Sequence, residues 1–306
     1  MTDAASLDVV PRLGPAAVAI LESLYQHRLL STRQVHALHT PKASLRFTQR
    51  TLARLRSVEL AASVHLPGGL GIWYLTEQGV DAVEAIPNRV ETRRKAIPRA
   101  HALGPLQAHT LGVNEIGLAF VRAARSRDDD CGFLSWRHEI AFPLTSSRTR
   151  RGDRLITDAV LTYQLNETSG KTSFHYRFIE FDRGTRASDD LALKIARYAR
   201  LYRRTVPRDD GEDAVPLWSQ HYPVFPTLLV VLAGRSVDAL ERRRRAVLAL
   251  CQQDPELEDT PEVEVSIGLL ADLQTQGPFA SIWRTVADPG RATNWLGDAG
   301  KSRSGR

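Results

Sequence analysis

Two short segments with strand-like composition, followed by a helix-like segment, constrain this chain more than any other feature. The first, residues 156–161, carries Asp158, and the second, residues 178–182, carries Glu180. The helix-like segment after them supplies Lys194. Carboxylates on neighbouring strands can hold a hard divalent cation such as Mg²⁺, and a lysine can stabilise phosphate charge. The order of these residues therefore favours the core of a metal-dependent nuclease.

Length and charge distribution indicate two domains and a polyanionic partner. The 306 residues can form two domains of ordinary size. Residues 1–104 carry 13 Lys and Arg against 8 Asp and Glu, whereas the remainder carries 28 against 27. A basic excess confined to the first third favours nucleic acid as its partner. No segment approaches the ~20 apolar residues of a membrane span, and no secretory segment begins the chain, so we expect a cytoplasmic protein without membrane contact.

The first third has the pattern of a winged helix-turn-helix. Helical periodicity predicts helices over residues 16–28 and 44–58, and a capping box at Ser31 begins a short helix between them. Two strand-like segments around the glycine-rich turn 67–71 predict a hairpin, and a last helix follows it. This order of helices and hairpin predicts a DNA-binding domain over residues 12–86.

The helix predicted over residues 44–58 is the expected recognition helix, and the hairpin tip is the expected wing. Phe47, Leu52 and Leu55 are expected to face the core. Arginines recur every four residues along another side, where they would meet phosphates and base edges in the major groove. The predicted DNA-binding residues of this domain are Arg46, Arg50, Arg54 and Gly69. A solvated arginine face, or a winged helix used for protein contacts, is the alternative.

A basic linker and a mixed α/β domain are predicted next. Residues 87–104 contain five basic residues and one acid, together with prolines, as is typical of an interdomain connection. Strand-like and helix-like segments then follow over residues 105–287, which predicts a mixed sheet with helices on its faces. Residues 288–306 are expected to form a flexible tail, and the arginine run 241–245 a solvated helix face. The further arginines expected to contact a DNA backbone are Arg93, Arg94, Arg150 and Arg151.

The second domain resembles the PD-(D/E)xK nuclease superfamily, which implies a restriction-endonuclease-like α/β fold. Thr157 and Asp158 match the proline–aspartate pair of that superfamily, and Glu180 and Asp182 match the two ends of its acid–x–lysine element. Threonine therefore replaces proline, and aspartate replaces lysine. Lys194 matches members whose lysine has moved to the following helix. The resemblance implies that Asp158, Glu180 and Lys194 are the catalytic residues.

The same resemblance implies a magnesium site. An acid on the preceding helix, Glu115, resembles the additional acid that some members carry. The implied metal ligands are Asp158, Glu180, Asp182 and Glu115. Asp182 places a negative charge where a positive charge usually helps the reaction. We therefore favour a catalytically silent nuclease-like domain over an active one.

Over roughly residues 15–285, the chain resembles the replication-relaxation family of plasmid-associated proteins. Residues 178–185 and 194–198 carry most of this resemblance. It implies a DNA-binding accessory role in plasmid or mobile-element replication and DNA relaxation. The implied partners are double-stranded DNA and replication or relaxation proteins, and a homodimer is left open. The alternatives are a Mg²⁺-dependent DNA endonuclease and a winged-helix transcriptional regulator.

Overall fold

Two compact units make up the chain in the computed structural model. Unit 1 comprises Met1–Leu118 with Gly132–Leu134, and unit 2 comprises Ala119–Cys131 with Ser135–Arg306. The boundary falls inside helix α6 (Gln107–Arg127). The residues that the structure describes are 13–66, 68–69, 71–86, 102–104, 106–145, 153–167, 169–207, 213–234 and 236–297.

The predicted linker and part of the predicted DNA contacts fall outside the described residues. Of residues 87–104, only 102–104 are described. The predicted backbone-contacting residues Arg93, Arg94, Arg150 and Arg151 lie outside the described ranges. These predictions therefore stay predictions from the sequence.

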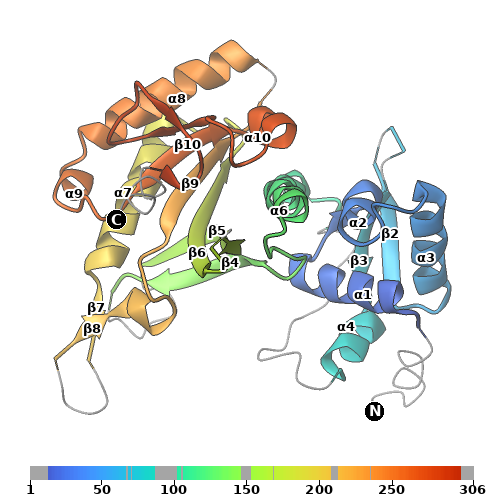
Figure 1. The fold of residues 1–306 in the computed structure, drawn as a ribbon. Helices are drawn as coiled ribbons and strands as arrows, with labels where there is room; N and C mark the ends of the chain where they lie inside the picture. Colours follow the sequence, from blue (N-terminus) through green and yellow to red (C-terminus); the bar gives the residue numbers. More distant parts are fainter. Residues whose placement is uncertain are drawn as a thin grey trace. The chain divides into compact units, whose positions relative to one another are not determined.

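Unit 1 combines helices with a small antiparallel sheet (Figure 1). In chain order its elements before α6 are α1 (Pro15–His27), β1 (Leu30–Ser31), α2 (Thr32–His39), α3 (Leu45–Ser57), β2 (Ala61–His65), β3 (Gly71–Leu75) and α4 (Glu77–Glu84). The sheet order is β1-β3-β2, and both pairs are antiparallel. The hairpin that the glycine-rich turn predicts is thus the β2–β3 pair.

Side-chain caps set where helices α2 and α3 of unit 1 begin. Before α2, the Ser31 hydroxyl accepts the Gln34 N–H at 3.2 Å, and the Gln34 side chain accepts the Ser31 N–H at 3.0 Å. This reciprocal pair is the predicted capping box, and it satisfies two backbone donors that would otherwise be unpaired. Ser44 caps α3 in the same way by accepting the Phe47 N–H at 3.3 Å. Helices α2 and α3 therefore each start directly after a serine that the sequence identifies as a possible cap.

The prediction that Phe47 of α3 faces the core is wrong. Phe47 is 41% exposed, whereas Thr48, Leu52 and Leu55 are fully buried. The buried residues are spaced by four and three positions, which places them on one helical stripe, and Phe47 lies about 100° from Thr48 around the axis. The Thr48 hydroxyl is satisfied by that of Thr40 at 2.6 Å. The hydrogen-bonded Thr48 thus occupies the core position that was predicted for the ring of Phe47.

Unit 2 is built on a mixed sheet of seven strands. Along the chain the strands are β4 (Trp136–Pro143), β5 (Arg154–Asn166), β6 (Thr172–Asp182), β9 (Thr227–Leu232), β10 (Val265–Leu269), β11 (Trp283–Thr285) and β12 (Ala292–Thr293). Their order in the sheet is β12-β11-β10-β9-β6-β5-β4. The β6–β9 and β9–β10 pairs are parallel, and the other pairs are antiparallel. This mixed α/β sheet agrees with the fold class predicted for the second domain.

The parallel pairs require crossovers, and helices supply them. Helix α7 (Ser188–Arg203) lies between β6 and β9 in the chain, and α8 (Val237–Gln252) lies between β9 and β10. The smaller elements of unit 2 are β7 (Thr205–Val206), β8 (Val215–Pro216), the 3-10 helix η2 (Leu217–Gln220), α9 (Pro255–Glu258) and α10 (Leu270–Gln276). None of the helices in the described ranges is both long and apolar enough to cross a membrane.

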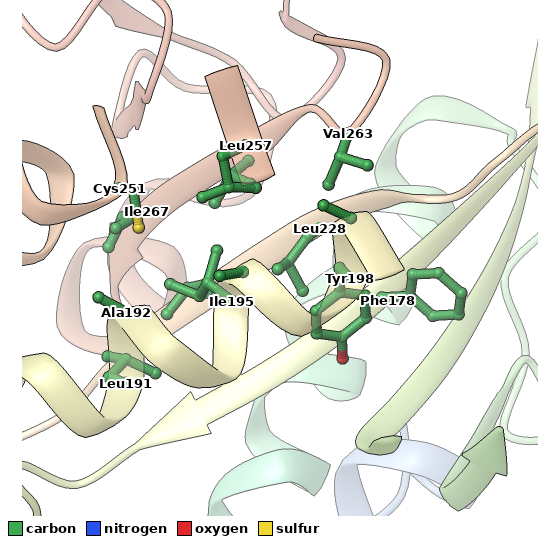
Figure 2. Packing of buried hydrophobic residues seen from close by; sticks show 14 of the residues in the cluster. Phe178, Leu191, Ala192, Ile195, Tyr198, Leu228, Cys251, Leu257, Val263 and Ile267 are labelled. Carbon is green, nitrogen blue, oxygen red and sulfur yellow. The ribbon is translucent and has the colours of Figure 1, made fainter. Parts of the chain in front are cut away.

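The main core of unit 2 lies between the sheet and helices α7 and α8. Figure 2 shows Ile195 and Tyr198 of α7 packed beside Phe178 of β6 and Leu228 of β9. Because side chains alternate along a strand, Glu180 and Asp182 lie on the same face of β6 as Phe178. Two acids therefore occupy the face of the sheet that the helices cover.

The prediction of a flexible tail over residues 288–306 is wrong for residues 288–297. Strand β12 closes the sheet edge by pairing with β11, and Trp295 is 1% exposed. The Trp295 ring makes edge contacts with Phe120 at 5.1 Å and Tyr163 at 5.0 Å between ring centroids. One large aromatic side chain can bury enough apolar surface to order a short polar segment. Residues 298–306 lie outside the described ranges.

We expect Trp295→Ala to lower the free energy of unfolding by about 3–5 kcal/mol, because it removes a fully buried aromatic side chain. Denaturant unfolding monitored by circular dichroism measures this change. Leu193→Ala is the matched control, since Leu193 is 63% exposed and its truncation is expected to have little effect. Equal stability of Trp295→Ala and the unchanged protein would contradict the structural role given to this segment.

Candidate functional site

The predicted catalytic residues lie where strands β5 and β6 stop pairing. Their antiparallel ladder ends at the Ala159↔Ile179 pair. Asp158 and Glu180 are the next residues on the two strands, so their side chains follow directly beyond the last paired position. Beyond that pair β6 continues alongside β9, with Glu180 opposite Val230. The divergence of β5 from β6 therefore opens a place for two acidic side chains.

Beyond the last paired position, polar side chains of β5 form hydrogen bonds with the β6 backbone, where the ladder between the two strands has ended. The Thr157 hydroxyl donates to the Ile179 carbonyl at 3.1 Å. Asp158 Oδ2 accepts the Phe181 N–H at 2.8 Å. A buried backbone group needs a partner, and these bonds supply partners where the ladder no longer does. Thr157 thus has a specific structural role here.

Helix α7 brings a lysine and a tyrosine to the two carboxylates. Lys194 Nζ donates to Asp158 Oδ1 at 3.2 Å and also to Glu180 Oε2. Tyr198, one helical turn later, donates its hydroxyl to Glu180 Oε1 at 2.5 Å. We call these four residues the acid–lysine cluster. The structure therefore brings together the three predicted catalytic residues, Asp158, Glu180 and Lys194, and adds Tyr198 to them.

The acid–lysine cluster is buried on one side and reaches solvent on the other. The Glu180 side chain is 2% exposed, whereas Asp158 and Lys194 are 15% and 24% exposed. Glu180 therefore has almost no water to solvate a charge, and it depends on the protein for its hydrogen bonds. Only Asp158 and Lys194 present a surface that a molecule from solution could touch.

Burial controls ionisation in the acid–lysine cluster. Burial raises the pKa of Glu180 to about 8; the Asp158 charge adds to this, and Lys194 and Tyr198 oppose it. Burial lowers the pKa of Lys194, but the two carboxylates outweigh burial, so the net pKa is raised. Burial and Glu180 also raise the pKa of Tyr198 well above its ordinary value. At neutral pH, Lys194 is therefore a cation and Tyr198 is a neutral donor, while burial makes the ionised form of Glu180 costly.

This arrangement does not fit a resident Mg²⁺ ion. All four carboxylate oxygens of Asp158 and Glu180 already accept hydrogen bonds from protein groups. Magnesium requires ionised oxygen ligands in a near-octahedral arrangement, whereas burial raises the pKa of Glu180 and so disfavours its ionised form. Within the described ranges, no three His, Cys, Asp or Glu side chains are grouped so as to hold a metal ion. The Lys194 ammonium supplies the positive charge between the two acids.

The other two implied metal ligands have other partners. Asp182 Oδ2 accepts Arg243 Nε at 2.5 Å, and both side chains are largely buried. Glu115 belongs to unit 1, where it accepts the Gln34 amide at 2.9 Å. Asp182 therefore forms an ion pair with α8 instead of sharing a cation with Glu180.

Sequence reasoning missed Arg243 and the role of Tyr198. Arg243 belongs to the run expected to be a solvated helix face, but it contacts Asp182 and also donates to the Ser188 hydroxyl at 3.4 Å, at the start of α7. Tyr198 is not among the predicted site residues. Its spacing of four residues from Lys194 is the signal that places both on one helical face.

In unit 1, α3 carries an exposed line of arginines. Arg46, Arg50 and Arg54, here called the arginine line, are all exposed. Helix α3 contains no acidic residue, and Arg56 lies over the Trp73 ring at 5.9 Å instead. No described carboxylate forms an ion pair with the arginine line. Three guanidinium groups are therefore left without a counter-charge on one helix surface.

The predicted wing residue Gly69 lies in the β2–β3 connection. Gly68 and Gly69 have φ angles of +88° and +79°. These backbone conformations are strained for a side chain larger than hydrogen, which explains the two glycines at this turn. A hydrogen bond from the Gly69 N–H to the Leu66 carbonyl at 3.0 Å closes the turn.

We expect the free energy of unfolding to fall between about pH 5 and pH 8 because of Glu180. The folded protein holds this proton up to a pKa of about 8, whereas an ordinary glutamate releases it near 4.5. Between these values the folded state binds more protons than the unfolded state, so stability falls by at most about 1.4 kcal/mol per pH unit. Glu180→Gln should make this slope shallower in denaturant unfolding measured at several pH values.

The exposed Glu258→Gln change on α9 is the control, and it should leave the slope unchanged. Comparing the variants isolates Glu180 from the other groups that titrate in this range. The same slope in Glu180→Gln as in the unchanged protein would contradict the raised pKa.

A known protein family matches more than half of this chain. The family model described as replication-relaxation matches residues 21–214, which is more than half of the 306 residues. The matched region contains both the arginine line and the acid–lysine cluster. No curated protein and no solved structure matches the chain. From the extent of the family match, this protein is a member of the replication-relaxation family.

Proposed function

We propose that this protein binds duplex DNA through unit 1 and serves as an accessory factor in plasmid or mobile-element replication or DNA relaxation. The family description supports a role in these processes. The observation that carries the DNA-binding part is the arginine line, because its three exposed guanidinium groups have no counter-charge among the described residues. Phosphates of a duplex would supply that counter-charge.

The order of elements in unit 1 supports a winged helix. Helices α1, α2 and α3 are followed by the β2–β3 hairpin, and β1 completes the sheet. In such domains the third helix lies in the major groove and the hairpin contacts the neighbouring backbone. The arginine line lies on this third helix, and the glycine turn lies at the hairpin tip. We infer that α3 is the recognition helix and that the β2–β3 turn is the wing.

The charge distribution around α3 also supports a duplex as the partner. Residues 23–58 contain seven Lys and Arg and no Asp or Glu. Each arginine that meets a phosphate releases condensed counterions, so binding gains free energy that falls as salt rises. A protein partner would have to present an unusually acidic surface to match the same helix.

We propose that unit 2 is a nuclease-like domain that does not cut DNA. Its mixed sheet and the meeting of Asp158, Glu180 and Lys194 support the likeness to a nuclease. The internally satisfied carboxylates and the raised pKa of Glu180 argue against catalysis. On this view the acid–lysine cluster stabilises the contact between α7 and the sheet.

We expect the double change Arg50→Ala and Arg54→Ala to weaken duplex binding about tenfold or more at physiological salt. The loss should be similar for all duplex sequences where the arginines contact phosphates, and larger for a preferred sequence where they read bases. The slope of log affinity against log salt should fall by roughly 2, one for each lost phosphate contact. Fluorescence anisotropy with labelled duplexes at several salt concentrations measures both quantities.

The control is the double change Arg242→Ala and Arg245→Ala, which removes two exposed helical arginines from α8 in unit 2. It changes the net charge by the same amount, so a general charge effect would weaken binding equally in both variants. Equal losses in the two double variants would contradict α3 as the DNA-binding helix.

A Mg²⁺-dependent DNA endonuclease is the second candidate, because the three residues that such chemistry would use meet in one place. A cation there would have to displace Lys194 from both carboxylates. We expect supercoiled plasmid to stay uncut when it is incubated with the protein in Mg²⁺ or Mn²⁺, as measured by gel electrophoresis. Cutting that disappears in both Asp158→Asn and Glu180→Gln would overturn the non-catalytic assignment. Cutting that persists in both variants would indicate a contaminating nuclease.

A further inference from the structure

An apolar ring borders the arginine line on α3. Phe47 is 41% exposed, and the helix axis places it about 20° from Arg54 and about 60° from Arg50. The buried stripe of Thr48, Leu52 and Leu55 lies farther round the helix, so Phe47 belongs to the basic surface. A phenylalanine in water at this position leaves apolar area unburied that a bound partner could cover.

Phe47 is held in this position by the start of α3. Its N–H is bonded to the Ser44 cap, and its carbonyl accepts the Thr51 hydroxyl at 3.1 Å. The ring therefore projects from the first turn of the helix, on a backbone that these bonds fix. In helices that read DNA, the residues nearest the N-terminus are the ones that contact base edges.

The chemistry of the major groove limits what such a ring could contact. The base edges there present hydrogen-bond donors and acceptors, and the one apolar group is the 5-methyl of thymine. A 5-methylcytosine carries the same group at the equivalent position. A phenyl ring beside the arginine line gains free energy in the major groove chiefly by covering this methyl, since it cannot pair with the polar groups.

We propose that Phe47 contacts the 5-methyl group of a pyrimidine in the major groove, so that the DNA site contains a thymine or 5-methylcytosine at that position. This inference rests on the proposed duplex binding by α3 and adds a specificity-determining residue to it. Arginines of the arginine line supply affinity, and Phe47 supplies discrimination at one base pair. Both kinds of contact come from one exposed helix surface.

The test uses the full chain and a duplex that it selects from a random pool. Each thymine of that duplex is replaced in turn by deoxyuridine, which lacks only the methyl group, and dissociation constants are measured by anisotropy. At the contacted position we expect thymine to be bound roughly three- to fourfold more tightly than uracil, as burial of one methyl implies. Phe47→Ala should bind the two duplexes equally.

Two further comparisons identify the base that carries the methyl group and test the role of the Phe47 ring. Cytosine and 5-methylcytosine at the same position, each paired with guanine, show whether the methyl group alone restores the preference. Leu45→Ala is the matched control: Leu45 is 39% exposed on the same helical turn but lies about 140° from Arg50 around the axis. It should keep the preference for thymine, and Phe47→Leu should keep part of it.

The outcomes distinguish this inference from the function on which it rests. Equal binding of thymine and uracil duplexes by the unchanged protein at every position, or the same preference in Phe47→Ala, would overturn the methyl contact. Duplex binding that still depends on Arg50 and Arg54 would then leave the proposed function standing. No duplex binding by the unchanged protein would remove both. Circular dichroism of each variant verifies that it is folded.

Discussion

The burial of Glu180 between the sheet and α7 is the constraint on which the rest of unit 2 depends. An unpaired carboxylate buried to this extent would cost several kcal/mol, so each of its oxygens needs a donor. Lys194 and Tyr198 supply those donors from two successive turns of α7. Because both must reach one carboxylate, they fix the rotation of α7 about its own axis. The apolar side chains of α7 then pack against the sheet in the orientation that Lys194 and Tyr198 set.

Asp182 imposes a second constraint of the same kind, two residues further along β6. Its carboxylate faces the same side of the sheet as Glu180, but its partner is Arg243 of α8. The two acids thus attach two different helices to one strand. Without Arg243, Asp182 would place a second negative charge close to Glu180 and raise the cost of burying both. Asp182 therefore anchors α8 to the sheet.

Local patterns predicted more of the site than of its surroundings. The order of the strand-like and helix-like segments, with the family resemblance, was enough to predict that Asp158, Glu180 and Lys194 belong to one site. The Asp182–Arg243 pair joins residues 61 positions apart in the chain, and no local pattern identifies such a partner. Trp295 was missed because a single aromatic residue among polar ones has no periodicity. Phe47 was misplaced because it is adjacent to the buried stripe, where one step of the helix decides exposure.

The two units differ in what neutralises their arginines, and this difference bears on where a polyanion binds. In unit 2, several arginines of α7 and α8 pair with carboxylates of the same unit, although Arg242 and Arg245 are exposed. The pairs are Arg197 with Asp153, Arg200 and Arg203 with Glu256, Arg243 with Asp182 and Arg244 with Glu241. A phosphate would have to compete with these carboxylates. In unit 1, the arginine line has no such competitor among the described residues. In the proposed binding mode, a duplex would therefore gain most from α3, although arginines are more numerous in the rest of the chain.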